Sequence, residues 1–103
     1  MLIITSVDKI PIRLTIERWQ HILHRHPELE TEENKILETV SSPDFVQEGD
    51  FNTKMAFKFY PQTPLTKKYL VVIYKEISNS DGFILTGYFT NQPIQRRRFL
   101  WKQ

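Results

Sequence analysis

The hydrophobic pattern changes its period near the middle of the chain, and this change constrains the fold more than any other feature. In the first half apolar side chains recur every three or four positions, which predicts two helices, over residues 16–26 and 32–40. In the second half they alternate with polar ones, which predicts strands over 54–60 and 83–90. Residues 69–74 are apolar on both faces of a strand, so we expect a central, buried strand there.

Shorter segments complete the predicted fold. Residues 2–7 are rich in β-branched and aliphatic side chains, 12–14 alternate like a short edge segment, and 45–48 form a further candidate strand. Short turns join the later strands, which favours an antiparallel meander. The prediction is one α+β domain over 1–103, with two N-terminal helices packed on an antiparallel meander of about four strands and a short extra N-terminal strand.

Composition excludes several classes of protein. The chain has no cysteine, which excludes disulfides, thiolate zinc sites and cysteine nucleophiles. It has no glycine-rich phosphate loop and no nucleophile elbow, so kinases, NTPases and hydrolases that use a nucleophile elbow have no support. No apolar run reaches the length of a membrane span, and the first residues lack the basic segment of a signal peptide. We therefore expect a cytoplasmic protein without membrane contact.

Charge is distributed unevenly along the chain. Residues 28–50 hold eight acidic side chains and one basic one, whereas residues 51–103 hold nine basic and two acidic ones. A cationic surface attracts partners that carry phosphate, which favours RNA or another polyanion. The alternative is that the two oppositely charged regions face each other or solvent.

All three histidines fall within the first predicted helix, together with two arginines. His26 lies on the apolar stripe and precedes a proline, which pushes it out of helical geometry and could aim its ring toward a cleft; a buried capping role is the alternative. His21 and Arg25 share a flank that could border a groove. Arg18 lies on the same flank but is expected to be solvated, and His24 projects away from the core. The spacing matches no zinc motif, so no metal or cofactor is expected.

Hydroxyl groups line one face of the last predicted strand. Regular alternation places Thr86, Tyr88 and Thr90 together, where they could bind phosphate oxygens and stack on a base. The opposite face would carry the apolar side chains Phe83, Leu85 and Phe89. Gly87 indicates a bulge or the close approach of a ligand. An ordinary solvent-exposed sheet face is the alternative, since strands favour Thr and Tyr in any case.

Further cations are candidates for substrate binding. Lys58 and Lys75 belong to neighbouring predicted strands, and the unknown register leaves the choice between them open. Arg96, Arg97 and Arg98 precede Phe99 and Trp101, a combination that could clamp a phosphate backbone and stack on bases. The alternative is a solvated tail that its aromatic side chains anchor to the domain.

At these residues the chain resembles a family of small bacterial and phage proteins grouped with the barnase–EndoU–colicin–RelE-like nucleases. The resemblance rests on the "W-x-H-I…R-H-P-E" helix, which corresponds to residues 17–29. Similar pieces follow at 42–44, 69–75 and 82–88, so the resemblance covers most of 15–90. It implies two helices followed by a four-stranded antiparallel meander.

The resemblance also implies an activity, which is metal-independent cleavage of RNA by attack of the 2′-hydroxyl on the adjacent phosphorus. On this chain it implies that His26 or His21 carries the proton, that Arg25 clamps the phosphate and that Thr86 and Tyr88 position the scissile group. Lys75 would be a second cation. Such a protein could be the toxin of a toxin–antitoxin or phage-conflict system, with an antitoxin or inhibitor protein as partner. The alternative is a catalytically inactive relative that binds RNA or a protein.

Overall fold

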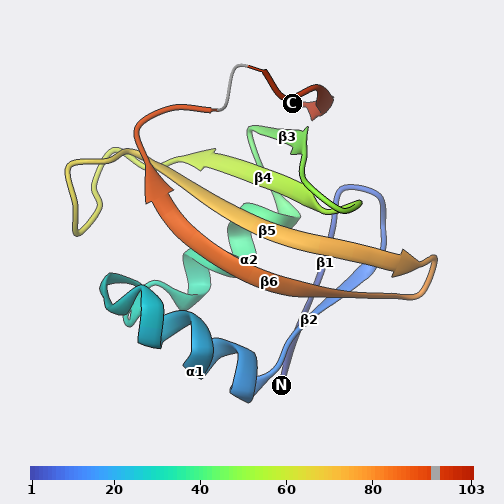
Figure 1. Cartoon of the computed structure of the whole chain (residues 1–103), viewed down its shortest axis with the longest axis horizontal. Helices are drawn as coiled ribbons and strands as arrows, with labels where there is room; N and C mark the ends of the chain where they lie inside the picture. The colour runs from blue at the N-terminus through green and yellow to red at the C-terminus, as the bar shows by residue number, and fades with distance from the viewer. Residues whose placement is uncertain (94–95) are drawn as a thin grey trace.

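The computed structural model describes residues 1–93 and 96–103. These residues form one seven-stranded sheet in the order β1-β2-β6-β5-β4-β3-β7 (Figure 1). The strands are β1 Leu2–Thr5, β2 Pro11–Leu14, β3 Phe45–Glu48, β4 Lys54–Phe59, β5 Tyr69–Ser78, β6 Asp81–Thr90 and β7 Phe99–Lys102.

The prediction of about four strands was wrong. Strands β3, β4, β5 and β6 are antiparallel neighbours in chain order, but the sheet extends beyond β3 on one side and beyond β6 on the other. The β1–β2 hairpin joins the β6 edge, where β2 runs parallel to β6, and β7 pairs antiparallel with β3 at the other edge. Alternation along a sequence identifies a strand but not the edge that it joins. The last strand also has a composition that resembles a basic tail.

The helices cover one face of the sheet (Figure 1). They are α1 Ile16–Arg25, the 3-10 turn η1 Pro27–Leu29 and α2 Glu33–Ser41. Helix α1 packs against β6, and α2 packs against β5, β4 and β1. Thr15 caps α1, because its hydroxyl accepts a hydrogen bond from the Arg18 backbone N–H at 3.1 Å. In the part of the chain that the structure describes, every helix is too short or too polar to cross a membrane.

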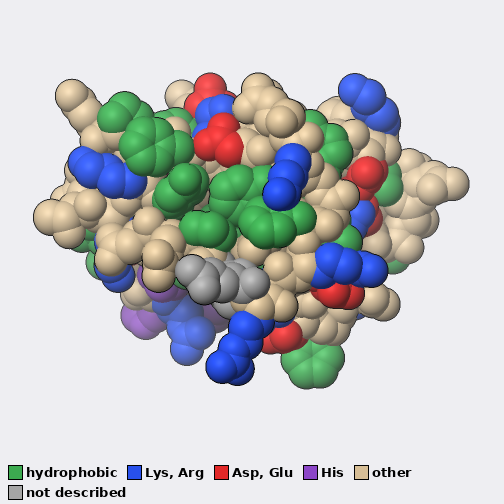
Figure 2. Space-filling model, turned by 90° about the horizontal axis from the view of Figure 1, so that it is seen from above, with side chains coloured by type: hydrophobic (Ala, Val, Ile, Leu, Met, Phe, Trp, Pro, Cys, Tyr) green, Lys and Arg blue, Asp and Glu red, His purple; other side chains and the backbone are tan. Residues whose placement is uncertain are grey.

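Apolar side chains pack on both faces of the sheet. The main core lies between the sheet and the helices and includes Ile22, Ile36, Val72, Ile84 and Phe89. A smaller cluster of Met55, Phe57 and Val71 lies on the opposite face, and Ile73 and Tyr88 pack against it. Seen from the side that carries the C-terminal strand, hydrophobic side chains gather at the surface among Lys and Arg (Figure 2).

A β-bulge interrupts the alternation of β6. Thr86 lies opposite Ile73 on β5, but Ile84 lies opposite Tyr74, so Leu85 is an extra residue. The two residues that flank this bulge, Ile84 and Thr86, therefore lie on opposite faces of the sheet, although they are two positions apart. The predicted grouping of Leu85 with Phe89 was wrong: Phe89 is in the main core, whereas Leu85 lies on the side of Thr86.

Gly87 lies against α2 and not in the bulge. A Cβ added there would lie 2.9 Å from Ile36 Cδ1 and 3.3 Å from the Val71 carbonyl oxygen. Gly87 therefore allows α2 to approach the sheet closely. The sequence suggested a bulge or the close approach of a ligand at this position, whereas the structure shows the close approach of a helix.

We expect Gly87→Val to lower the free energy of unfolding by about 1–3 kcal/mol, because the added methyl groups overpack the contact with Ile36. Urea unfolding followed by circular dichroism measures the change as a lower midpoint. Thr90→Val on the same strand is the control, and we expect it to change stability by less than about 0.5 kcal/mol. An unchanged midpoint in Gly87→Val would contradict the close packing of α2.

Candidate functional site

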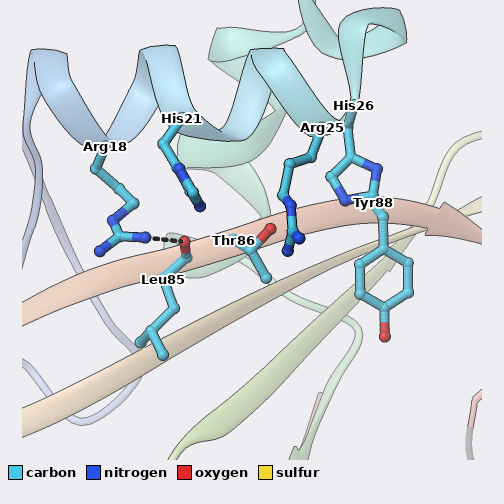
Figure 3. A pocket seen from close by; sticks show the side chains of 7 residues that line it. All are labelled: Arg18, His21, Arg25, His26, Leu85, Thr86 and Tyr88. Carbon is cyan, nitrogen blue, oxygen red and sulfur yellow. Dashed lines mark hydrogen bonds between the residues drawn. The ribbon is translucent and has the colours of Figure 1, made fainter.

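An open cavity of about 510 Å³ lies between α1 and β6 (Figure 3). This volume is in the range of about 300–1,000 Å³ that is typical of ligand sites. We call it the histidine cavity. The described residues that line it are Arg18, His21, Arg25, His26, Leu85, Thr86 and Tyr88.

Helical spacing brings three of these side chains onto one face of α1. Arg18, His21 and Arg25 follow one another at three and four residues, which is one side of a helix. All three point toward β6 in Figure 3. Arg18 also donates a hydrogen bond from Nη1 to the Leu85 carbonyl oxygen at 3.4 Å. The helix is therefore tied to the strand at the bulge.

His26 enters the cavity because the helix ends there. It is the C-cap residue of α1, with φ −134° and ψ 70°, which lies outside the helical region that a following proline disfavours. Its ring centroid lies 5.9 Å from that of Tyr88, and its Nδ1 lies 3.7 Å from Glu28 Oε2. The side chain is 31% exposed, so it borders the cavity and is not part of the buried core.

The structure brings together all five residues that the sequence proposed as catalytic, His21, Arg25, His26, Thr86 and Tyr88. Sequence reasoning missed two others. It placed Arg18 on the same flank as His21 and Arg25 but expected this side chain to be solvated, whereas Arg18 lines the cavity. It placed Leu85 on the wrong side of β6, and no signal in the sequence of one strand marks a bulge of this kind.

The predicted lysines lie elsewhere. Lys58 points to the helix side of the sheet, where its Nζ donates to the Ser42 carbonyl oxygen at 2.7 Å. Lys75 lies opposite Phe83 in the β5–β6 ladder. Neither of them belongs to the described residues that line the histidine cavity.

The C-terminal arginines pair in part with the acidic segment. Both ends of the Arg97 guanidinium donate to the Asp50 carboxylate, at 3.1 and 3.2 Å. This pairing lowers the pKa of Asp50. Arg98 lies 3.6 Å from Glu48, whereas Arg96 is exposed. Opposite charges in the two halves of the chain therefore face each other here, which was the alternative to a free cationic surface.

A second cavity adjoins the first. It has a volume of about 320 Å³ and shares Leu85 and Tyr88 with the histidine cavity. We call it the Phe51 cavity. Its other described lining residues come from the β3–β4 turn, from the C-terminal segment and from the face of the sheet opposite the helices, which we call the open face. They are Asp50, Phe51, Thr53, Met55, Ile73 and Arg97.

The histidine cavity combines the groups needed to bind an anion and to move protons. Guanidinium groups bind phosphate oxygens through charge-assisted hydrogen bonds, and imidazoles exchange protons near neutral pH. Across the described residues, no three His, Asp or Glu side chains are grouped as ligands for a metal ion. No protein-family model, curated protein or solved structure matches the chain.

Proposed function

We propose that the protein is a metal-independent endoribonuclease that cleaves RNA by transphosphorylation. The observation that carries the proposal is the meeting of two arginines, two histidines, a threonine and a tyrosine around one open cavity. The resemblance of the α1 segment to small bacterial and phage nucleases points to the same chemistry.

In this reaction the 2′-hydroxyl oxygen of a ribose attacks the adjacent phosphorus, and the bond to the 5′-oxygen of the next nucleotide breaks. A base takes the proton of the 2′-hydroxyl, and an acid protonates the leaving 5′-oxygen. The products are a 2′,3′-cyclic phosphate and a free 5′-hydroxyl. Arg18 and Arg25 would stabilise the negative charge that develops on the phosphorane oxygens.

The order of side chains along α1 suits this scheme. His21 and His26 are five residues apart, which corresponds to about 7.5 Å along a helix axis. Arg25 lies between them in the view of Figure 3. A phosphate bound by Arg25 would thus have an imidazole on either side, one to accept a proton and one to donate a proton.

Thr86 and Tyr88 would position the scissile group from the opposite wall. Both side chains come from β6, which is held by its long ladder with β5. A hydroxyl on a rigid strand is a better positioned hydrogen-bonding group than one on a loop. The Tyr88 ring also offers a surface on which a base can stack.

The proposal extends to partners and location. A small nuclease of this kind would act on RNA in the cytoplasm as the toxin of a toxin–antitoxin or phage-conflict system. An antitoxin or inhibitor protein would then cover the histidine cavity. The tail arginines that pair with acidic side chains would contribute less to RNA binding than Arg18 and Arg25.

We expect the purified protein to cleave a mixed RNA pool in the presence of EDTA and to leave 2′,3′-cyclic phosphate ends. The ends can be identified because phosphatase does not remove a cyclic phosphate until acid has opened it. RNA with 2′-deoxy substitution at the cut site is the control, and it should stay intact because it lacks the attacking hydroxyl.

A folded protein that binds RNA in a salt-dependent manner but never cuts it would contradict the nuclease proposal. That result would instead support the alternative of an inactive relative that binds RNA. Absence of both cutting and salt-dependent binding would direct the search to a protein partner.

A further inference from the structure

The Phe51 cavity has a mainly apolar lining with polar groups among it. Met55, Ile73 and Leu85 are neighbours on the open face of the sheet, and two aromatic side chains, Phe51 and Tyr88, join them. Asp50, Thr53 and Arg97 are the remaining described residues of the lining. An apolar pocket with a few fixed polar groups is typical of a site for a small, flat ligand with a polar edge.

Phe51 is held in an exposed position by an ordered turn. The residue is 91% exposed, although it is large and apolar. Phe51 and Asn52 have φ values of 55° and 63°, a left-handed conformation that non-glycine residues seldom adopt. Such a conformation persists only where the surroundings enforce it, and it is found most often at functional sites.

Hydrogen bonds enforce this turn. The Gly49 N–H donates to the Thr53 carbonyl oxygen at 2.9 Å, and the Thr53 N–H donates to the Asp50 carbonyl oxygen at 3.0 Å. The Thr53 hydroxyl donates to the same oxygen of Asp50 at 2.6 Å. Arg97 then binds the Asp50 side chain with both ends of its guanidinium. The chain thus maintains an exposed aromatic ring beside a cavity.

The position of this cavity suggests its ligand. It shares Leu85 and Tyr88 with the histidine cavity, so a molecule that occupies both would pass Tyr88. The histidine cavity carries the cations that bind phosphate, whereas the Phe51 cavity carries the aromatic and apolar surface. A nucleotide has the same division, with an anionic phosphate and a flat base that stacks on aromatic side chains.

We propose that the Phe51 cavity is a nucleobase-binding subsite, which takes the base of a nucleotide next to the phosphate bound in the histidine cavity. This inference rests on the proposed RNA substrate. The base stacks on Phe51 and Tyr88, and its polar edge meets Arg97, Thr53 or Asp50.

The test compares nucleotides with a sugar phosphate that lacks a base. AMP, GMP, CMP, UMP and ribose 5-phosphate are titrated into the protein, and NMR signals of the Phe51 and Tyr88 rings give the dissociation constants. We expect at least one nucleotide to bind five-fold or more tightly than ribose 5-phosphate, because stacking contributes that much per base. Phe51→Ala should abolish this preference, and Phe51→Trp should keep it.

Phe59→Ala is the matched control. Phe59 is also an exposed phenylalanine, at 48%, but it packs against Tyr69 and is not among the described residues of the cavity lining. This variant should bind nucleotides like the wild type. Equal binding of nucleotides and ribose 5-phosphate would overturn the subsite, as would a base preference that survives in Phe51→Ala.

The same experiment separates the subsite from the nuclease proposal. A base preference that depends on Phe51, in a protein that cuts no RNA, would support the subsite while the nuclease proposal fails. Cleavage of RNA by a protein with no base preference would overturn the subsite and leave the nuclease proposal standing.

Discussion

Replacing His21 and His26 together by alanine is expected to lower the rate of RNA cleavage by at least about 100-fold. General acid and general base catalysis contribute about 10²- to 10⁴-fold each, and the double variant removes both candidate proton carriers. The fold should persist, because His21 is exposed and the His26 side chain is 31% exposed. The measurement is kcat for a defined RNA in EDTA, with circular dichroism to verify the fold.

His24→Ala is the control for this double variant. His24 lies on the same helix and is exposed, but it is not part of the described lining of the histidine cavity. It should cleave RNA within about two-fold of the wild-type rate, as expected of a surface change that touches no site. Wild-type cleavage by the double variant would exclude His21 and His26 as the proton carriers. An equal loss in His24→Ala would indicate a general effect on the helix.

The contents of the histidine cavity could be largely predicted from the sequence because most of the signals are local. Helical spacing fixes that His21 and Arg25 share one side of α1. Pro27 ends the helix and turns His26 out of it. Short-range rules of this kind require no knowledge of the rest of the chain.

The errors arise where a structural feature depends on a distant partner. The bulge at Leu85 exists only in relation to β5, since it is a shift of register between two strands. The parallel pairing of β2 with β6 joins segments about 70 residues apart. The role of Lys58 also depends on a partner, because its neighbour Ser42 belongs to the end of α2. Periodicity along one segment contains none of this information.

The Phe51 cavity could not be predicted from the sequence, because it too depends on contacts between distant segments. Its lining comes from the β3–β4 turn, three strands and the C-terminal segment. Phe51 stands in the sequence as one aromatic residue after an acidic stretch, and its left-handed backbone is set by Asp50 and Thr53. The basic segment around Arg97 suggested a free clamp for phosphate, whereas in the fold Arg97 secures this turn.

Lys54→Met is expected to lower the free energy of unfolding by about 2–3 kcal/mol. Lys54 Nζ lies 2.6 Å from Asp8 Oδ2 and also binds the Glu76 carboxylate, which accepts a further hydrogen bond from the Ser6 hydroxyl at 2.6 Å. The Glu76 side chain is only 9% exposed, so the variant leaves a buried carboxylate without its cation. Loss of one partner from a fully buried ion pair costs about 3–5 kcal/mol. We expect a smaller loss of stability here because Lys54 is partly exposed. Thermal unfolding should show Tm lower by roughly 10–20 °C.

A second variant shows whether the loss comes from the unpaired carboxylate. Lys54→Met with Glu76→Gln should recover more than half of the stability, since no buried charge remains. No recovery in the double variant would assign the loss to packing of the lysine stem instead.

The stability difference between wild type and Lys54→Met should also depend on pH. The hydrogen bond from Lys54 lowers the pKa of Asp8 below 3.8, although burial acts to raise it. The stability that Asp8 gains from this contact is therefore lost as the pH falls through the lowered pKa. Burial alone would lower the pKa of Lys54, but its bonds to Asp8 and Glu76 outweigh burial and raise the pKa above 10.5. The stability that Lys54 gains from these contacts is lost as the pH rises through its raised pKa. The difference should therefore be largest between about pH 4 and 10, and a constant difference down to pH 2 would contradict the ionic origin of this contact.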